Sequence, residues 1–369
     1  MDFSSRLNTL KKRRQGPDVS SGMAFDSADW VLKSNVAGME GYETLAESEG
    51  VKYAVGAMSP VDSRYTQISI AEGERVAASL IKALWAEGFN AEMQLQGSVG
   101  LDVHIKGYSD VDMLVLVTDT VLVETPEIIP NDYRPAVDQR PLSEIIQDLR
   151  GRSERILPQN FPAVRVNVDG GKSISMEGGS LQRKVDIVPS AWYHPISYQQ
   201  NRGDDYRRGV QILNKHDSSL IVNYPFLNRK LINDADMTVQ GNIKRLVRLM
   251  KNLQSDAEGE CAKHIVGLNS FDILSIAYDM RAQLVIPPYM KLGLVGILTN
   301  HLKYLIENEW YRNLIETPDQ TRKVFDSDKI VALAYLYIEC KDLAESLSRE
   351  ISPYREFDNT ILMSKAIYG

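Results

Sequence analysis

The sequence is poor in the residues that bind zinc or form disulfides. It has two cysteines, Cys261 and Cys340, and five histidines, and neither set has the spacing of metal ligands. Two distant cysteines are typical of reduced thiols, so we expect a cytoplasmic protein. Long apolar runs are also missing, because the longest, IVALAYLYI from Ile330, is much shorter than a bilayer span. No apolar core follows the basic N-terminal residues, which argues against a signal peptide, and we expect no membrane association.

The chain also lacks an excess of positive charge. It has 42 Lys and Arg against 49 Asp and Glu, which gives a net charge of −7. A protein that coats nucleic acid needs a dominant basic surface to neutralise phosphates, so we do not expect bulk nucleic-acid binding. A small anionic substrate held in a local basic pocket is compatible with this balance.

The sequence does contain a mixed first part and a helical second part. Apolar residues repeat at helical spacing over 70–89 and alternate as in a half-buried strand over 90–96. Residues 163–189 are typical of three short strands, the first two joined by an Asp-Gly turn. From Gln240 onward the pattern is mostly helical.

These patterns predict an α+β fold with two lobes, which a chain of 369 residues can support. We place a mixed β-sheet core at residues 70–225 and a helical lobe at residues 226–369. Residues 1–69 form a partly helical N-terminal segment that we expect to pack on both lobes.

The apolar strand DVDMLVLV begins with two carboxylates, Asp110 and Asp112. Residues two apart on a strand project from the same face, so the two side chains lie next to each other. Neighbouring carboxylates repel each other unless a cation lies between them, and a buried carboxylate is costly unless it is paired. Mg²⁺, which prefers hard oxygen ligands and is often shared with substrate phosphates, is the cation we expect. The alternative is a pair of solvated acids at the start of a strand.

Two further motifs lie before and after this strand. Gly97-Ser98 follows the half-buried strand, and a tight glycine turn lets backbone amides and the serine hydroxyl approach a phosphate. Asp186 lies within the apolar segment RKVDIVP, where a third carboxylate would complete a two-metal site. The simpler alternatives are an ordinary turn for Gly97-Ser98 and an ion pair with Lys184 or Arg183 for Asp186.

The order of these motifs resembles that of the DNA polymerase β-like nucleotidyltransferase superfamily. In that superfamily Gly-Ser comes first, Asp-x-Asp on a strand follows, and an Asp on a later strand comes last. Within it, the chain is similar to the bacterial cGAS/DncV-like nucleotidyltransferases, or CD-NTases. The similarity rests on a helix before the Gly-Ser strand, on VPSAWY after Asp186, and on the segments NIKRLVRLMK and SFDILSIAYDM. It extends over residues 70–280 and implies a bilobal nucleotidyltransferase fold with a mixed β-sheet catalytic core and a helical second lobe.

The resemblance also implies which residues form the site. Asp110, Asp112 and Asp186 would be the catalytic carboxylates and would hold two Mg²⁺ ions, with Mn²⁺ as an alternative metal. Gly97 and Ser98 would bind the phosphates of the nucleotide.

Three more positions are candidates for nucleotide binding. The family has a triphosphate-binding lysine at the position of Lys251, for which a solvated basic helix face is the alternative. Ser270 matches a family serine that contacts phosphate, and it could also be the N-cap of the helix that follows it. Tyr193 follows the third-aspartate strand and could either stack on a nucleobase or pack in the interior.

For the function, the resemblance implies an enzyme that joins two or three NTPs into a cyclic oligonucleotide. That second messenger would switch on a downstream effector in antiphage, CBASS-type signalling. The alternatives are a nucleotidyltransferase that modifies RNA, a protein or a small molecule, and an inactive nucleotide-binding scaffold. The bases, the linkage and the ring size are left open.

A regulatory partner is a further implication. In some CD-NTase systems an E1/E2-like partner conjugates the enzyme through a terminal glycine, which would be Gly369 here. An ordinary C-terminal tail is the alternative.

Overall fold

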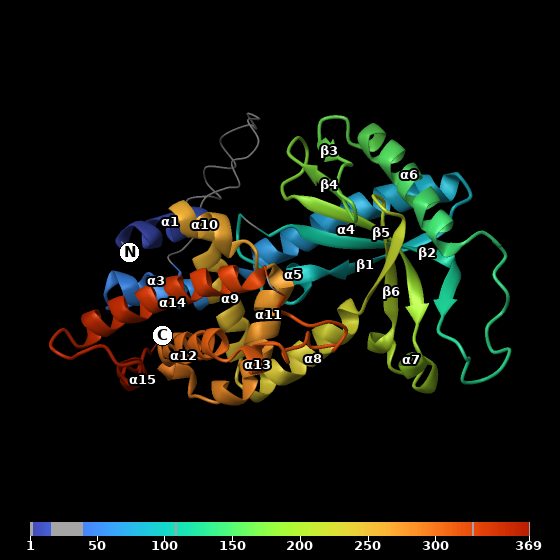
Figure 1. Ribbon diagram of the computed structural model, residues 1–369. Coiled ribbons are helices and arrows are strands. Elements are labelled where there is room, and N and C mark those ends of the chain that lie inside the picture. Colours follow the sequence, from blue (N-terminus) through green and yellow to red (C-terminus); the bar gives the residue numbers. More distant parts are fainter. Residues whose placement is uncertain (1–2, 16–39, 108, 327, 369) are drawn as a thin grey trace.

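The computed structural model describes residues 3–15, 40–107, 109–326 and 328–368, which form two lobes side by side (Figure 1). One lobe is a mixed β-sheet with helices packed on it, and the other is built from helices. The first described helix and the last described residues both lie in the helical lobe (Figure 1). The predicted α+β fold with a helical second lobe is therefore confirmed.

A seven-stranded sheet forms the centre of the first lobe. Its strands are β1 (Ala91–Gln96), β2 (Val111–Val123), β3 (Arg165–Asn167), β4 (Ile174–Glu177), β5 (Val185–His194), β6 (Gly209–Asn214) and β7 (Ser219–Asn223). β2 lies between β1, to which it is antiparallel, and β5, to which it is parallel. On its other side β5 pairs with β4 over residues 185–187 and with β6 over residues 190–193.

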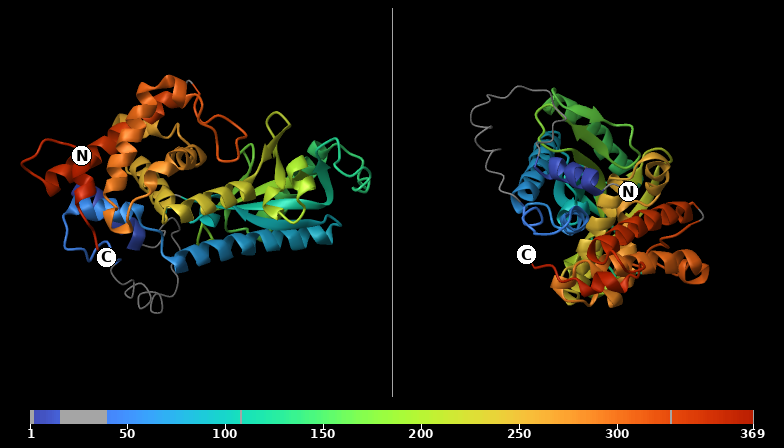
Figure 2. Two further views of the ribbon diagram at one scale, coloured as in Figure 1. Left: turned by 90° about the horizontal axis from the view of Figure 1, so that it is seen from below. Right: turned by 90° about the vertical axis from the view of Figure 1, so that its left-hand side faces the viewer.

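One face of the sheet is covered by α4 (Ser63–Ala86) and α6 (Leu142–Asn160). Figure 2 shows α4 running along this lobe. The N-cap of α4 is Asp62, whose side chain accepts hydrogen bonds from the amides of Arg64 and Tyr65 (2.9 and 3.3 Å). Such an N-cap contributes about 1 kcal/mol to helix stability.

Gly73 allows α4 to approach the start of β2 closely. A Cβ atom at Gly73 would lie 2.7 Å from Val111 Cγ1 and 3.0 Å from Met113 Cγ, so a larger side chain would push the helix away. The close contact fixes the end of β2 at which the predicted carboxylates lie.

The opposite face of the sheet carries alternate residues of the same strands. Leu114 and Leu116 of β2 lie on it with Val188 and Trp192 of β5, and they pack against Phe226. Phe226 belongs to α8 (Pro225–Thr238), the first helix after the sheet. By the same alternation Asp112 and Asp186 project from this face, toward the junction of the two lobes.

The helical lobe is built around α9 (Asn242–Ser255), which is buried along most of its length and contacts α3, α11 and α14. The other helices of this lobe are α1 (Phe3–Gln15), α3 (Glu49–Met58), α10 (Gly259–Ile265), α11 (Ser270–Asp279), α12 (Gly293–Glu307), α13 (Glu309–Arg312), α14 (Lys329–Ile351) and α15 (Thr360–Ser364). Shorter helical turns are α5 (Gly97–Gly100), α7 (Ile196–Gln200), η1 (Asp205–Arg207), η2 (Met280–Leu284) and η3 (Pro288–Met290).

Side chains of α9 donate hydrogen bonds to backbone carbonyls of α3, within the helical lobe, and of the loop between α5 and β2, in the sheet lobe. These bonds are Arg248 to Met58 (2.9 Å) and Asp102 (2.6 Å), Lys251 to Val103 (3.2 Å), and Asn252 to Ala57 (2.9 Å). The acceptors lie at and just before the end of α3 and in the loop after α5. α9 therefore positions the loop that leads from Gly97-Ser98 to Asp112.

The structure corrects one predicted boundary and shows one hairpin that was not predicted. The predicted boundary between residues 69 and 70 falls inside α4, because the Asp62 cap starts that helix at Ser63. The β6–β7 hairpin was not predicted; β6 is buried on both faces, Gln211 included, so its sequence lacks the regular apolar–polar alternation of a half-buried strand. The helical lobe begins with α8 at Pro225, one residue before the predicted boundary at 226.

The N-terminal segment shares the core of the helical lobe. Leu7, Leu10 and Tyr53 are buried in the same cluster as Leu246 of α9. The described part of the segment also touches the sheet lobe, where Lys106 Nζ donates to a carbonyl of α1 (2.8 Å).

The predicted conjugation residue Gly369 lies outside the described residues. The residues before it are docked on η3: the Ile367 amide donates to the Tyr289 carbonyl (2.7 Å), and the Tyr368 ring stacks on the Tyr289 ring at 5.8 Å.

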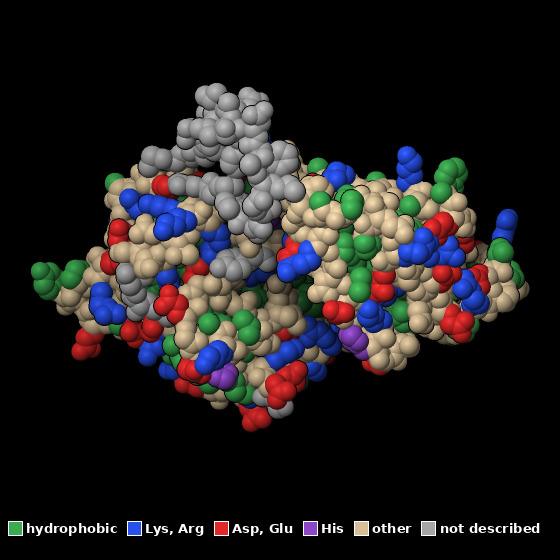
Figure 3. All heavy atoms as spheres, turned by 90° about the horizontal axis from the view of Figure 1, so that it is seen from above, with side chains coloured by type: hydrophobic (Ala, Val, Ile, Leu, Met, Phe, Trp, Pro, Cys, Tyr) green, Lys and Arg blue, Asp and Glu red, His purple; other side chains and the backbone are tan. Residues whose placement is uncertain are grey.

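The described helices include none with the length and apolarity that a bilayer span requires. On the face drawn in Figure 3, acidic and basic side chains are interspersed over both lobes, and the described residues form no broad field of one sign.

Candidate active site

The predicted carboxylates meet at one edge of the sheet. Asp112 and Asp186 are aligned neighbours in the parallel β2–β5 pair, so their backbones lie about 4.8 Å apart. Asp110 lies one residue before β2 begins. The sequence spacing thus correctly predicted that these side chains lie together.

Each carboxylate has a different environment. Asp110 accepts a hydrogen bond from Lys184 Nζ (2.7 Å), so Lys184 pairs with Asp110 and not with Asp186. Asp186 Oδ2 accepts a hydrogen bond from Ser173 Oγ (3.0 Å). Its Oδ1 is buried and has no hydrogen-bond partner among the described residues. A buried carboxylate oxygen without a donor is suited to a cation.

The proximity of the acids changes their protonation. Burial raises the pKa of Asp112 to about 7, and the charges of Asp186 and Asp110 act in the same direction against those of Lys251 and Lys184. Burial also raises the pKa of Asp110, although the bond from Lys184 lowers it. A cation placed between these groups would relieve their repulsion.

Two of the three carboxylates, Asp112 and Asp186, are suited to bind Mg²⁺. In the part of the chain that the structure describes, no three Asp, Glu, His or Cys side chains are arranged to hold a metal ion. Asp112 and Asp186 offer the hard oxygen donors that Mg²⁺ prefers, while Asp110 is held by Lys184. Metal binding by all three carboxylates therefore stays a prediction, in which Asp110 would use the oxygen that Lys184 does not contact or would exchange its lysine for the metal.

Gly97 lies directly against Asp112. Its φ of +77° is in the left-handed region that favours glycine, and a Cβ atom there would collide with Asp112 Oδ2. Ser98 follows in α5, and its carbonyl accepts a hydrogen bond from the Val103 amide (3.0 Å). The structure thus brings the Gly-Ser motif to the carboxylates.

Lys251 is buried beside the same loop. It is 5% exposed, and its Nζ donates to the Val103 carbonyl (3.2 Å). Burial lowers its pKa to about 8, while the charge of Asp112 opposes that shift. A solvated basic helix face is therefore wrong for Lys251, which lies close enough to Asp112 for their charges to interact.

A cavity of ≈ 280 Å³ opens next to Asp112, between the sheet and the helical lobe. It is bounded by Leu95, Gln96, Gly97, Gly100, Leu101, Asp112, Asn223, Pro225, Asn228, Arg229, Phe271 and Leu274. Sequence reasoning missed Phe271, Asn228 and Arg229. The position of Phe271, directly after the candidate Ser270, was the one signal that could have indicated it.

Ser270 lies near this cavity but is not among the residues that bound it. It is the exposed first residue of α11. The N-cap is Asn269, whose side chain accepts from the Phe271 and Asp272 amides, so the N-cap alternative for Ser270 is wrong. Phosphate contact by Ser270 stays a prediction.

The structure does not bring Tyr193 to the carboxylates. It lies seven residues beyond Asp186 on β5, or about 23 Å along the strand. The odd number of residues also places its side chain on the opposite face of the sheet. Its ring packs near that of Tyr224, with 6.3 Å between centroids. Stacking on a nucleobase held at Asp112 is therefore wrong. The alternation of side chains along a strand already predicts that Asp186 and Tyr193 project from opposite faces.

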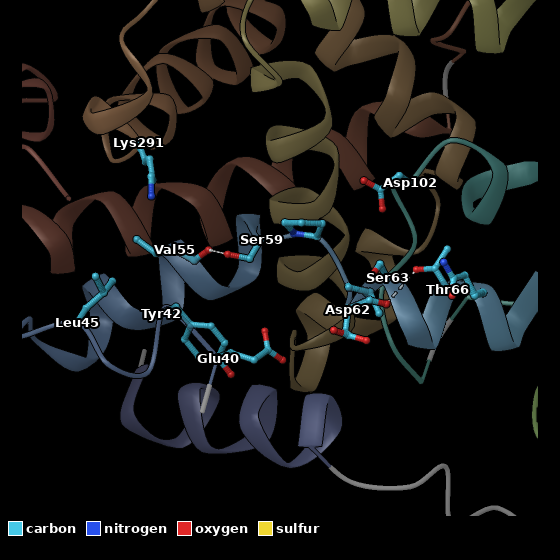
Figure 4. Close-up of a pocket in the computed structure, with 14 residues that line it drawn as sticks. Glu40, Tyr42, Leu45, Val55, Ser59, Asp62, Ser63, Thr66, Asp102 and Lys291 are labelled. Atoms are coloured by element: carbon cyan, nitrogen blue, oxygen red, sulfur yellow. Dashed lines mark hydrogen bonds between the residues drawn. The ribbon is translucent and has the colours of Figure 1, made fainter. Parts of the chain in front are cut away.

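A larger cavity of ≈ 680 Å³ lies between α3 and the start of α4 (Figure 4). Lys291 and Asp102 lie on one side of it, and Glu40 and Tyr42 on the other. None of the predicted catalytic carboxylates bounds it. Its acids have other roles: Glu40 pairs with an arginine of α1, Asp62 caps α4, and Asp102 Oδ2 lies 3.6 Å from Arg248 Nη1. We therefore do not place nucleotide chemistry there.

The raised pKa of Asp112 predicts a pH-dependent stability. Between its ordinary pKa of 3.8 and about 7, the folded protein binds more protons than the unfolded chain, so stability falls as pH rises through this window. Without divalent metal, Asp112→Asn should therefore raise the melting temperature at pH 8, by on the order of 5 °C. The difference should shrink as the pH is lowered to 5. Thermal melts in EDTA test this, and a difference that does not change with pH would contradict it.

Comparison with family models finds no match. Among known proteins, the chain is similar to the cyclic dinucleotide synthase CdnE of Yersinia aleksiciae, with 32% identity over 366 residues, or 95% of this chain and 93% of the relative. It is 30% identical over 317 residues to a c-di-GMP synthase of Capnocytophaga granulosa, or 80% of this chain and 87% of that protein.

Among solved structures, the chain is similar to a STING-associated CdnE c-di-GMP synthase from Capnocytophaga granulosa. The TM-score is 0.68 with 27% identity, and the match covers 94% of this chain and 99% of that one. The similarity in sequence and fold extends over nearly the whole chain, and the Gly-Ser motif lies beside paired strand carboxylates. This protein therefore belongs to the bacterial cGAS/DncV-like nucleotidyltransferase (CD-NTase) family.

Proposed function

We propose that this protein is a Mg²⁺-dependent synthase that joins two NTPs into a cyclic dinucleotide. The observation that carries the proposal is the aligned pair Asp112 and Asp186 beside a cavity that Gly97 also bounds. The names of its relatives, a cyclic dinucleotide synthase and c-di-GMP synthases, support a dinucleotide over a trinucleotide product.

In the reaction we propose, a ribose hydroxyl of one nucleotide attacks the α-phosphorus of the other. A new P–O bond forms, the bond to pyrophosphate breaks, and pyrophosphate leaves with its electron pair. Asp186, whose Oδ1 lacks a donor among the described residues, would accept the hydroxyl proton. A second, intramolecular transfer of the same kind would close the ring.

The chain's own residues would orient the triphosphate for this attack. The backbone at Gly97 and the Ser98 hydroxyl would donate hydrogen bonds to phosphate oxygens, and Lys251 would move from the Val103 carbonyl to the phosphates. Mg²⁺, held by Asp112 and Asp186, would supply charge neutralisation and activation of the hydroxyl when bound.

We further propose that the product activates an effector in antiphage signalling. The support is that a similar solved synthase is STING-associated. Regulation by a further partner, including conjugation through Gly369, and a cytoplasmic location stay predictions.

Incubation of the protein with all four NTPs and Mg²⁺ tests the proposal. We expect a phosphatase-resistant product with the mass of a cyclic dinucleotide, and no such product from Asp112→Asn or Asp186→Asn proteins. A linear or covalently attached product would indicate RNA, a protein or a small molecule as the acceptor. NTP binding without any product, even with extract of infected cells added, would indicate a scaffold.

A further inference from the structure

The geometry points to Arg229 of α8 as the residue that selects the base. We propose that Arg229 binds the O6 and N7 edge of a guanine held in the cavity beside Asp112, and so favours GTP over ATP. The inference rests on the proposed function, since it assumes that an NTP occupies this cavity.

Arg229 reaches from the helical side of the cavity toward the sheet. A Cβ atom at Gly100, at the end of α5, would lie 3.7 Å from Arg229 Nη1, which places the guanidinium beside the Gly-Ser helix. Its Cζ lies 5.5 Å from the centroid of the Phe226 ring, an arrangement that holds the side chain against the sheet face. Arg229 is thus positioned by a ring one turn earlier on the same helix.

The guanidinium forms no ion pair or hydrogen bond with the described residues. Its neighbour Lys230 differs, because it pairs with Asp234 on the outer surface of α8. A half-buried guanidinium without an acid has all its N–H donors available to a ligand. Such a ligand must offer acceptors.

The rest of the cavity wall favours a base over a phosphate at this place. Much of the lining is apolar: Leu95, Leu101, Pro225, Phe271 and Leu274. A charged phosphate is costly to bury among such groups, whereas a nucleobase has apolar faces and polar edges. Phe271 offers a ring against which a base can stack. Lys251, the candidate triphosphate ligand, does not bound this cavity.

The donor pattern of arginine selects among the bases. A guanidinium has only donors, and guanine offers it two neighbouring acceptors, O6 and N7. Adenine presents N7 beside an amino donor. One N–H of the guanidinium would then face the adenine amino group, and two donors cannot form a hydrogen bond. Asn228 complements this choice: its Oδ1 is buried without a partner among the described residues, and guanine carries the N1–H and N2–H donors that such an acceptor needs.

Binding measurements separate the base from the rest of the nucleotide. With Mg²⁺ present, α,β-methylene analogues of GTP and ATP are titrated calorimetrically into the wild-type protein and into Arg229→Gln. We expect the wild type to prefer the GTP analogue by on the order of 10- to 100-fold, and Arg229→Gln to lose that preference mainly by weaker GTP binding. The wild type should bind the 7-deaza GTP analogue less tightly than the GTP analogue. Arg229→Gln should bind these two analogues equally tightly.

Lys230→Gln is the matched control, because it makes the same change one residue along the helix but outside the cavity; it should keep the preference for guanine. Arg229→Lys keeps the charge and offers only donors but lacks the planar fork, so it should weaken the preference without abolishing it; it also guards against misfolding of the Gln variant.

Equal weakening of both analogues by Arg229→Gln would overturn the inference and indicate a phosphate or ribose contact. A wild-type protein without a preference for guanine would also overturn it, and cyclic product made from other bases would then leave the proposed function intact. Failure of every analogue to bind would overturn both.

Discussion

Asp112→Asn should lower the rate of nucleotidyl transfer by on the order of a thousand-fold or more, because the amide keeps the size of the side chain and removes its charge. Asp112 is the carboxylate that bounds the cavity, aligns with Asp186 and lies against Gly97. No other described acid bounds that cavity and could replace it. The initial rate of pyrophosphate release from NTPs measures the effect.

Asp119→Asn is the control for this substitution. Asp119 lies on the same strand β2 but is exposed and accepts hydrogen bonds from Asn90 Nδ2 at 3.0 and 3.1 Å. The control protein should keep its activity. If Asp112→Asn retained more than about a tenth of the rate, the assignment of Asp112 to the reaction would be wrong.

Gly97→Ala should lower the rate by on the order of a hundred-fold, although it adds a single methyl group. That methyl group would occupy the place of Asp112 Oδ2, so the carboxylate or the Gly-Ser turn has to move. A displacement of about 1 Å at reacting groups is enough for a loss of this size. Steady-state rates and melting temperatures of the variant together measure whether the fold or the site is affected.

Gly88→Ala separates the collision from backbone strain. Gly88 has a φ of +74°, close to that of Gly97, and a Cβ atom there would meet nothing within 4 Å. Both variants should lose about 1–2 kcal/mol of stability from the left-handed backbone, but only Gly97→Ala should lose activity. Equal losses of activity would show that strain, and not the contact with Asp112, is responsible.

The carboxylate centre could be predicted from the sequence because each part of it is local. Two acids at the start of one apolar strand and a third within another have few explanations other than a shared edge of a sheet. Their alignment could not be predicted, since the register of β2 and β5 depends on how α4 and α6 pack on the sheet. The alternation along β5 does carry such information, because Tyr193 is an odd number of residues from Asp186 and so projects from the opposite face of the sheet.

The helical wall of the cavity could not be predicted. Arg229 and Asn228 lie on α8, a helix without any motif, and they reach the cavity only because the lobes meet there. That arrangement arises from contacts between residues far apart in the chain, such as Arg248 with the Asp102 carbonyl. A spacing rule along the sequence carries no information about such contacts.

The bonds from α9 to backbone carbonyls also bear on how this protein can diverge. A carbonyl is present at every position, so those bonds set no requirement on which amino acid occupies positions 57, 58, 102 or 103. The bonds that reach the sheet lobe are then encoded largely on one side, in Arg248 and Lys251. Two homologues can therefore keep these bonds while the residues that supply the carbonyls change, within the limits that core packing sets on the buried Ala57, Met58 and Val103.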